Sequence, residues 1–138
     1  MAKRTWTLTK QFSFEASHVL PHHDGLCHNL HGHTWVVRVE VRGERLHNDG
    51  PQQGMVMDFG NIKKAIAPVL VEYLDHHHLN DTIPLLGVDM STGDDASNPT
   101  SEALAAWLFY RLKPEIPLLS AIEIDETPTS RCRYQEEP

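Results

Sequence analysis

Alternating apolar and polar positions mark two long strands in the first third of the chain. Between residues 5 and 18 the apolar side chains occupy even positions: Trp6, Leu8, Phe12, Phe14 and Ala16. Between residues 31 and 41 they occupy odd positions: Trp35, Val37, Val39 and Val41. Successive side chains of a strand point to opposite faces, so each segment predicts a strand with one buried face.

Two further strands are predicted near the end of the sequence. Residues 118–126 form the third, with Leu118, Ile122 and Ile124 facing inward, and residues 131–135 form a short fourth. The sequence ends in a tail, residues 135–138, that we expect to be frayed.

Helical spacing appears twice between these strand pairs. Asp58 is a suitable N-cap for a first helix, and Pro68 should kink that helix or weaken one of its turns. Asn98 or Thr100 can cap a second helix, which Pro114 ends. The apolar stripes consist of Ile62, Ile66, Val69 and Tyr73 in the first helix and of Leu104, Trp107, Leu108 and Leu112 in the second.

The predicted order is therefore β-β-α-α-β-β, an α+β fold in one domain spanning residues 1–138. We expect an antiparallel four-stranded sheet with both helices on one face. The polar stretch 87–98, rich in small residues, is expected to be a mobile loop. The two sheet edges stay open unless a partner covers them, which favours oligomerisation through the edges.

Three histidines lie on the inward faces of the first two strands. His18 shares the parity of the first apolar face, His31 and His33 share that of the second, and Cys27 lies in the connection between the strands. Three imidazoles with an open fourth position are typical of a catalytic zinc site. The alternatives are a core histidine at His18, surface histidines at the other two positions, and a Cys27 that is either a small buried residue or a fourth ligand.

Charge and cysteine content narrow the class of protein. The 19 acidic and 12 basic residues give a net charge of −7, which argues against general binding of nucleic acid or anionic membranes. No apolar run approaches the roughly 20 residues of a membrane span, and no leader pattern opens the sequence. With only two cysteines, a disulfide-built secreted domain is not indicated. We expect a cytoplasmic protein with reduced thiols.

Further polar residues suggest acid–base chemistry. Asp75 next to His76 is a pattern in which a carboxylate orients an imidazole, although the run through His78 is also typical of a solvated helix end. Glu126 has the inward parity of the third strand, where a carboxylate is costly unless paired, or else it is a solvated turn residue. Thr100 and Ser101 are first explained as helix caps.

Six motifs, in this order, resemble those of the 6-pyruvoyl-tetrahydropterin synthase family, from about Phe12 to Tyr134. Within the family, the chain resembles the carboxy-forming branch, which acts in queuosine biosynthesis. The resemblance lies in the spacing of three residues between the cysteine and His-Gly-His and in the motifs PTSE and LLSA (118–121). The stretch 87–97 is longer than we expect for this branch. The motifs are FSFEASH (12–18), CHNLHGH (27–33), GMVMDF (54–59), LDHHHLN (74–80), PTSE (99–102) and ET (126–127).

The resemblance implies the T-fold, in which subunits join their sheets into a barrel and stack as a hexamer with active sites between subunits. It implies that 7,8-dihydroneopterin triphosphate is converted to 6-carboxytetrahydropterin, acetaldehyde and triphosphate. A pyruvoyl-forming synthase, a non-catalytic zinc- or purine-binding module and a zinc hydrolase are the alternatives. The last is weakened because the sequence has no His-Glu-x-x-His motif.

The resemblance also implies a role for each matched residue. His18, His31 and His33 would bind zinc, Cys27 would be a general base, and Asp75 with His76 would be a second proton-transfer pair. Glu126 would anchor the pterin, whose adjacent N–H and amino groups match the two oxygens of a carboxylate, and Thr100 and Ser101 would make secondary substrate contacts.

Overall fold

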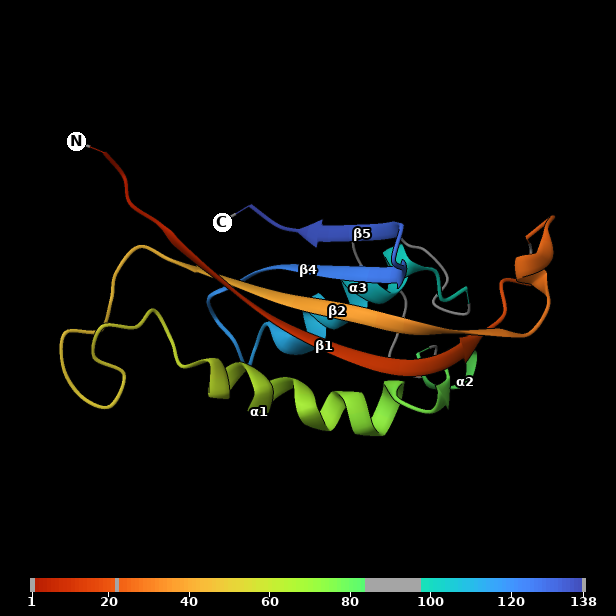
Figure 1. Ribbon diagram of the computed structural model, residues 1–138, viewed down its shortest axis with the longest axis horizontal. Helices are drawn as coiled ribbons and strands as arrows, with labels where there is room; N and C mark the ends of the chain where they lie inside the picture. The colour runs from red at the N-terminus through yellow and green to blue at the C-terminus, as the bar shows by residue number, and fades with distance from the viewer. Residues whose placement is uncertain (1, 22, 84–97, 138) are drawn as a thin grey trace.

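One mixed five-stranded sheet organises the computed structural model of the chain, which describes residues 2–21, 23–83 and 98–137 (Figure 1). The strand order is β3-β1-β2-β4-β5, and the four strands predicted from the sequence pair antiparallel within it. The strands are β1 (Trp6–His18), β2 (His31–Gly43), β3 (His77–His78), β4 (Leu119–Thr127) and β5 (Ser130–Gln135).

The prediction of a purely antiparallel four-stranded sheet was wrong in one respect. The two-residue strand β3 pairs parallel with β1, opposite Ala16 and Ser17. A strand of two residues has no period for a sequence pattern to reveal, and backbone pairing with a distant strand alone creates it. It adds a parallel pair at the end of β1 that carries His18.

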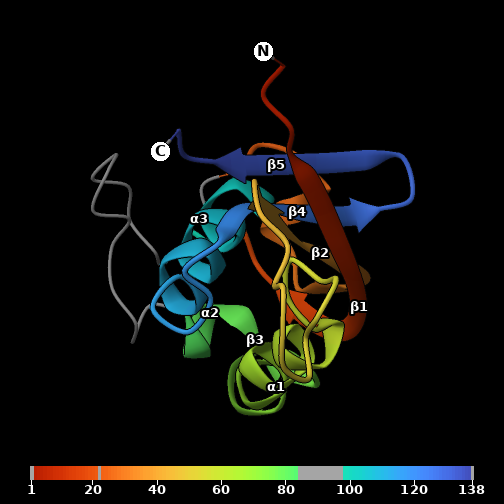
Figure 2. The same ribbon diagram turned by 90° about the vertical axis from the view of Figure 1, so that its left-hand side faces the viewer.

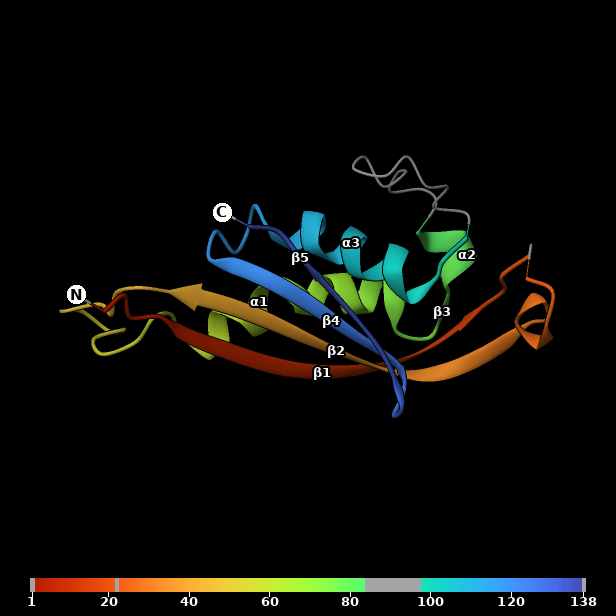
Figure 3. The ribbon, with the colours of Figure 1, turned by 90° about the horizontal axis from the view of Figure 1, so that it is seen from above.

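Two main helices cover the same face of the sheet, as the sequence predicts (Figures 2 and 3). They are α1 (Phe59–Val69) and α3 (Ser101–Leu112), and the shorter elements are the 3-10 helix η1 (Leu26–His28), the π-helix η2 (Leu70–Leu74) and α2 (Leu79–Thr82). Asp58 caps α1 by accepting the Gly60 N–H at 2.7 Å, and Thr100 caps α3 by accepting the Ala103 N–H at 3.1 Å. No helix in the described part of the chain is long and apolar enough to span a membrane.

Pro68 lies inside α1, and the π-helix η2 begins two residues later, at Leu70. Proline has no N–H to donate, which weakens the regular helical ladder at this turn. The chain continues as η2, where the Asp75 N–H donates to the Leu70 carbonyl at 2.7 Å, five residues back. This wide turn delivers the chain to Asp75 and His76, so the turn that the sequence marks as weak leads into candidate site residues.

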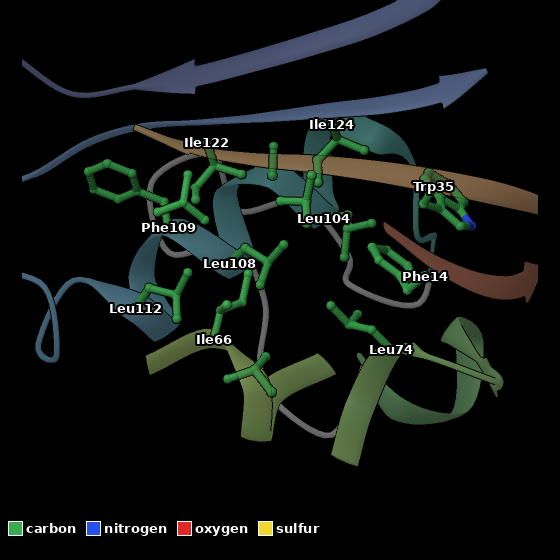
Figure 4. Close-up of a cluster of buried hydrophobic side chains, with 14 of the residues drawn as sticks. Phe14, Trp35, Ile66, Leu74, Leu104, Leu108, Phe109, Leu112, Ile122 and Ile124 are labelled. Atoms are coloured by element: carbon green, nitrogen blue, oxygen red, sulfur yellow. The ribbon is translucent and has the colours of Figure 1, made fainter. Parts of the chain in front are cut away.

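The core fills the space between the sheet and the helices (Figure 4). Leu104 and Leu108 of α3 and Ile66 of α1 are fully buried against the inward side chains of the strands. The prediction for Leu118 was wrong, because this side chain is 41% exposed and Leu119 is buried instead. A register shift between β2 and β4 beside Val41 changes the parity at the start of β4, which periodicity alone does not show.

The predicted loop 87–98 lies outside the described residues except for Asn98. The structure describes the predicted tail as far as Glu137, and its frayed state stays a prediction. Gln135 pairs with Ala121 at the end of β5, and the Glu136 carboxylate accepts hydrogen bonds from the hydroxyls of Tyr110 and Tyr134 at 2.5 and 2.6 Å. Ladder pairing and two hydroxyl donors therefore hold this end of the chain.

Candidate metal centre and proton-transfer site

Three imidazoles converge at adjacent ends of β1 and β2. His18 lies directly opposite His31 in the antiparallel register, and His33 lies opposite Ala16. The ring centroids are 4.4 Å apart for His18 and His31, 5.2 Å for His18 and His33, and 4.9 Å for His31 and His33. The shared parity noted in the sequence thus brings the three rings together on the helix-covered face of the sheet.

Backbone carbonyls fix the orientation of two of these rings. His18 Nδ1 donates to the Pro99 carbonyl at 2.9 Å, and His31 Nδ1 donates to the Asn29 carbonyl at 2.8 Å. A carbonyl only accepts, so each Nδ1 carries the proton and each Nε2 of a neutral ring keeps a free lone pair. The Nε2 atoms of His18, His31 and His33 are buried, and among the described residues the Glu126 carboxylate is the polar side chain beside two of them, His18 and His33. This arrangement is typical of metal-binding histidines.

Burial favours the neutral, ligating form of two of the histidines, His18 and His33. Burial lowers the pKa of His18, which is fully buried, although the hydrogen bond to the Pro99 carbonyl raises it. Burial also lowers the pKa of His33, against the influence of Glu126. Both rings are therefore predominantly neutral at pH 7, the state in which an imidazole binds a metal ion.

Glu126 reaches the same place from the end of β4. Its Oε1 lies 3.1 Å from His33 Nε2 and 3.4 Å from His18 Nε2. A register shift between Asp125 and Thr127 marks this position as a bulge, a feature that redirects side chains. The sequence assigns Glu126 to substrate binding, whereas the structure places its carboxylate beside the imidazoles and adds a second possible role, that of a fourth ligand.

The donor set fits a zinc ion. One ligand atom from each of His18, His31, His33 and Glu126 lies within 4.8 Å of the others. Three imidazoles with a carboxylate or an exchangeable fourth position suit zinc, and such an ion would explain why the buried Nε2 atoms converge. The described chain therefore contains a candidate metal centre built on the histidines that the sequence singles out.

Cys27 lies outside this group of candidate ligands. It occupies η1, in the connection between the strand ends that carry His18 and His31, and its thiol is free and half-buried. The Leu20 N–H donates to the Cys27 carbonyl at 2.9 Å and closes the connection into a loop. The thiol is thus held on the segment that links two candidate ligands, His18 and His31, without belonging to the candidate ligand cluster.

Asp75 and His76 form the pair that their sequence adjacency left open. The Asp75 Oδ2 lies 3.0 Å from His76 Nδ1, and the Oδ1 accepts the Glu15 N–H at 2.9 Å. These two hydrogen bonds lower the pKa of Asp75, with the Glu15 N–H as the larger cause. His76 has a left-handed φ of 61°, and its N–H donates to the Glu15 carbonyl at 2.6 Å. The carboxylate can thus hold the proton on Nδ1 and leave Nε2 free for proton transfer.

The other two histidines of the run have different partners. His77 Nε2 is 3.0 Å from the Val71 carbonyl, and His78 Nδ1 is 3.0 Å from the Ser17 hydroxyl. His76 is the member of the run that pairs with a carboxylate. A shallow surface depression of about 630 Å³ is lined by His33 and by all three of these histidines, so one candidate ligand and His76 border the same space.

Thr100 and Ser101 are engaged in local contacts at the start of α3. Thr100 is the N-cap, and the Ser101 hydroxyl donates to the Glu102 carboxylate at 2.7 Å. The preceding Pro99 supplies the carbonyl that orients His18, a contact that the sequence did not reveal. Backbone groups carry no residue-type signal, so Pro99 and Asn29 could not be identified as supporting residues from the sequence.

Comparison with known proteins gives a consistent family. The family model described as 6-pyruvoyl tetrahydropterin synthase matches residues 7–137. A relative from Synechocystis sp., named 6-carboxy-5,6,7,8-tetrahydropterin synthase, is 45% identical and the match covers 94% of this chain and 92% of the relative. A relative of the same name from Haemophilus influenzae is 37% identical, with 94% and 98% covered. The solved 6-pyruvoyl tetrahydropterin synthase of Caenorhabditis elegans has a TM-score of 0.75 and 28% identity, with 99% of this chain and 100% of that chain covered.

Proposed function

The chain belongs to the 6-pyruvoyl tetrahydropterin synthase family and has its T-fold, and we propose that it is a zinc-dependent 6-carboxy-5,6,7,8-tetrahydropterin synthase. The reaction converts 7,8-dihydroneopterin triphosphate to 6-carboxytetrahydropterin, acetaldehyde and triphosphate, for queuosine biosynthesis. The name and extent of similarity of the relatives support the substrate and the product. The observation that carries the assignment of a catalytic metal centre is the convergence of three buried histidine Nε2 atoms and the Glu126 carboxylate within 4.8 Å of one another. The cytoplasmic location expected from the sequence stays a prediction.

Each half of the site has a distinct task in this proposal. His18, His31 and His33 would hold zinc, whose Lewis acidity would make protons near the oxygens of a hydroxylated side chain easier to remove. Cys27 would accept a proton as thiolate, and His76, oriented by Asp75, would exchange a second proton through Nε2. The surface depression that His33 and His76 both line is consistent with both halves acting on one substrate.

Substrate anchoring falls to Glu126, with Thr100 and Ser101 in supporting contacts. A carboxylate presents two acceptors side by side, which match the adjacent N–H groups of a pterin. The Glu126 side chain is 25% exposed and therefore open to a ligand, unlike a fully enclosed core carboxylate. Thr100 and Ser101 already serve the start of α3, so their contribution to substrate binding would come with that structural role.

The decisive experiment is product identification. The purified protein with zinc is incubated with 7,8-dihydroneopterin triphosphate, and the products are separated and identified by mass. Acetaldehyde together with the carboxypterin supports the proposal. The pyruvoyl product without acetaldehyde would assign the chain to the pyruvoyl-forming branch, which is the name that the solved C. elegans protein carries. Absence of any turnover by zinc-loaded protein would favour a non-catalytic binding module.

Replacing Glu126 with glutamine separates its two possible roles. If Glu126 anchors the pterin, the change puts an amide donor against the pterin's own donors. The loss of about 2–4 kcal/mol corresponds to a decrease of about 30- to 1,000-fold in kcat/KM. Zinc content, measured by atomic emission, should stay unchanged. The matched control is Glu44→Gln, at an exposed surface ion pair with Lys3. Loss of zinc in Glu126→Gln would instead identify the carboxylate as a ligand.

We also predict a stable homo-oligomer, hexameric by analogy with the family. β3 covers only two residues of the thirteen-residue β1, and β5 forms the opposite edge, so both edges have unpaired backbone groups. Leu26 and Leu30, on either side of Cys27, are 84% and 70% exposed, which suits an interface near the site. Sedimentation at micromolar concentration should give the mass of six 15.7-kDa chains. A fully active monomer would contradict both the barrel and a site shared between subunits.

A further inference from the structure

The side chain of Asn80 makes two hydrogen bonds to the backbone of Val19, as the main chain of a neighbouring strand would. Its Oδ1 accepts the Val19 N–H at 2.8 Å, and its Nδ2 donates to the Val19 carbonyl at 2.8 Å. One carboxamide therefore satisfies both backbone polar groups of a residue 61 positions earlier in the chain. Val19 directly follows His18, which is a candidate zinc ligand.

This contact extends a continuous seam between two segments. The seam begins at Glu15, whose N–H donates to the Asp75 carboxylate and whose carbonyl accepts the His76 N–H. It continues through the parallel pairing of Ala16 and Ser17 with β3. Asn80 then takes the place of backbone at Val19, because α2 has begun and the main chain has turned away.

We propose that Asn80 is a positioning residue that fixes the Asp75–His76 pair relative to the metal centre. His18 lies between Ser17 and Val19, and both neighbours are tied to the segment that carries His76. With Asn80 in place, the end of β1 and the His76 turn move as one body. The effect of Asn80 on turnover rests on the proposed function, whereas its role in linking the end of β1 to the His76 turn does not.

The chemistry of a carboxamide is required at this position. Aspartate keeps an acceptor for the Val19 N–H but cannot donate to the Val19 carbonyl, and its charge faces that oxygen. Alanine removes both hydrogen bonds and leaves two partly buried backbone groups without this partner. The isosteric Asn80→Asp thus removes one of the two hydrogen bonds to Val19, and the truncated Asn80→Ala removes both.

The test combines kinetics with two measurements that need no substrate. In zinc-loaded Asn80→Asp and Asn80→Ala, kcat should fall by about 10- to 100-fold with KM within about threefold, since misplacement of a proton-transfer group affects turnover more than binding. Zinc affinity, measured by competition with a chelator, should fall by about 10- to 100-fold, the usual effect of losing an outer support of a metal site. Hydrogen-exchange mass spectrometry should show faster exchange in peptides that contain Val19 and in those that contain His76.

The control and the contrary outcomes are well defined. Asn61→Asp makes the same change on the exposed surface of α1 and should alter none of these quantities. The proposal is overturned if zinc affinity and His76 exchange stay within threefold of wild type in both Asn80 variants, even if the unfolding temperature falls. If wild-type protein makes no pterin product, the proposed function fails, but zinc affinity and coupled exchange still decide the role of Asn80.

Discussion

Replacing His31 with alanine should lower zinc affinity by more than about 100-fold, beyond the 10- to 100-fold effect of altering an outer support of a metal site. His31 is half-buried and its Nε2 points into the cluster without a partner. It lies outside the hydrophobic core, so its truncation should leave the fold intact. His18 is less suitable for this test, because it is fully buried against Trp35 and its removal would also leave a cavity.

Metal content and folding are measured on the same sample. Zinc affinity is measured by competition with a chelator, and the secondary structure and unfolding temperature are measured by circular dichroism. His47→Ala is the control, because His47 is exposed and follows the opposite end of β2. Wild-type zinc affinity in His31→Ala would remove this histidine from the ligand set. Loss of fold would show that the metal stabilises the sheet, contrary to our expectation.

The convergence of the three histidines was largely predictable because strand parity is a local property. His18, His31 and His33 continue apolar faces that period two defines, and antiparallel pairing of neighbouring strands brings their ends together. The helix caps at Asp58 and Thr100 were predictable for the same reason, since each depends on residues two or three positions away. Local chemistry thus accounts for the main elements and for the gathering of the histidines.

Features that depend on distant backbone groups were not predictable. β3, the support of His18 by Pro99 and the pairing of Asn80 with Val19 join segments about 60 to 80 residues apart. No period or motif encodes such contacts, because one partner is a main-chain N–H or carbonyl that every residue type supplies. The bulge beside Glu126 was not predictable either, although it sets the direction in which the carboxylate points.

Truncation of either proton-transfer group should reduce turnover strongly. Positioned acid–base groups typically contribute 10²- to 10⁴-fold, so Cys27→Ala and His76→Ala should each lose at least about 100-fold in kcat while retaining zinc. Cys132→Ala is the matched control for the thiol, because Cys132 lies on β5 and is not a member of the candidate ligand cluster. His77→Ala and His78→Ala should have mild effects, since these rings pair with the Val71 carbonyl and the Ser17 hydroxyl instead of a carboxylate.

Two results would change the assignment of Cys27. Turnover of Cys27→Ala near the wild-type rate would show that the base lies elsewhere. Loss of zinc in the same variant would make the thiol a ligand, although the described ligand cluster consists of His18, His31, His33 and Glu126. Steady-state kinetics and metal analysis of one preparation therefore distinguish a base from a ligand.

Mixing the two inactive variants tests whether subunits share a site. The His76 side chain is 79% exposed in the single chain, and the apolar neighbours of Cys27 are also exposed. Proton transfer during such a reaction benefits from exclusion of water, which a second subunit would provide. If Cys27 and His76 of one site come from different chains, random reassembly of equal amounts of Cys27→Ala and His76→Ala should give about a quarter of sites with both groups intact. Recovery toward a quarter of wild-type activity would therefore establish shared sites, and activity no higher than that of either variant alone would place both groups on one chain.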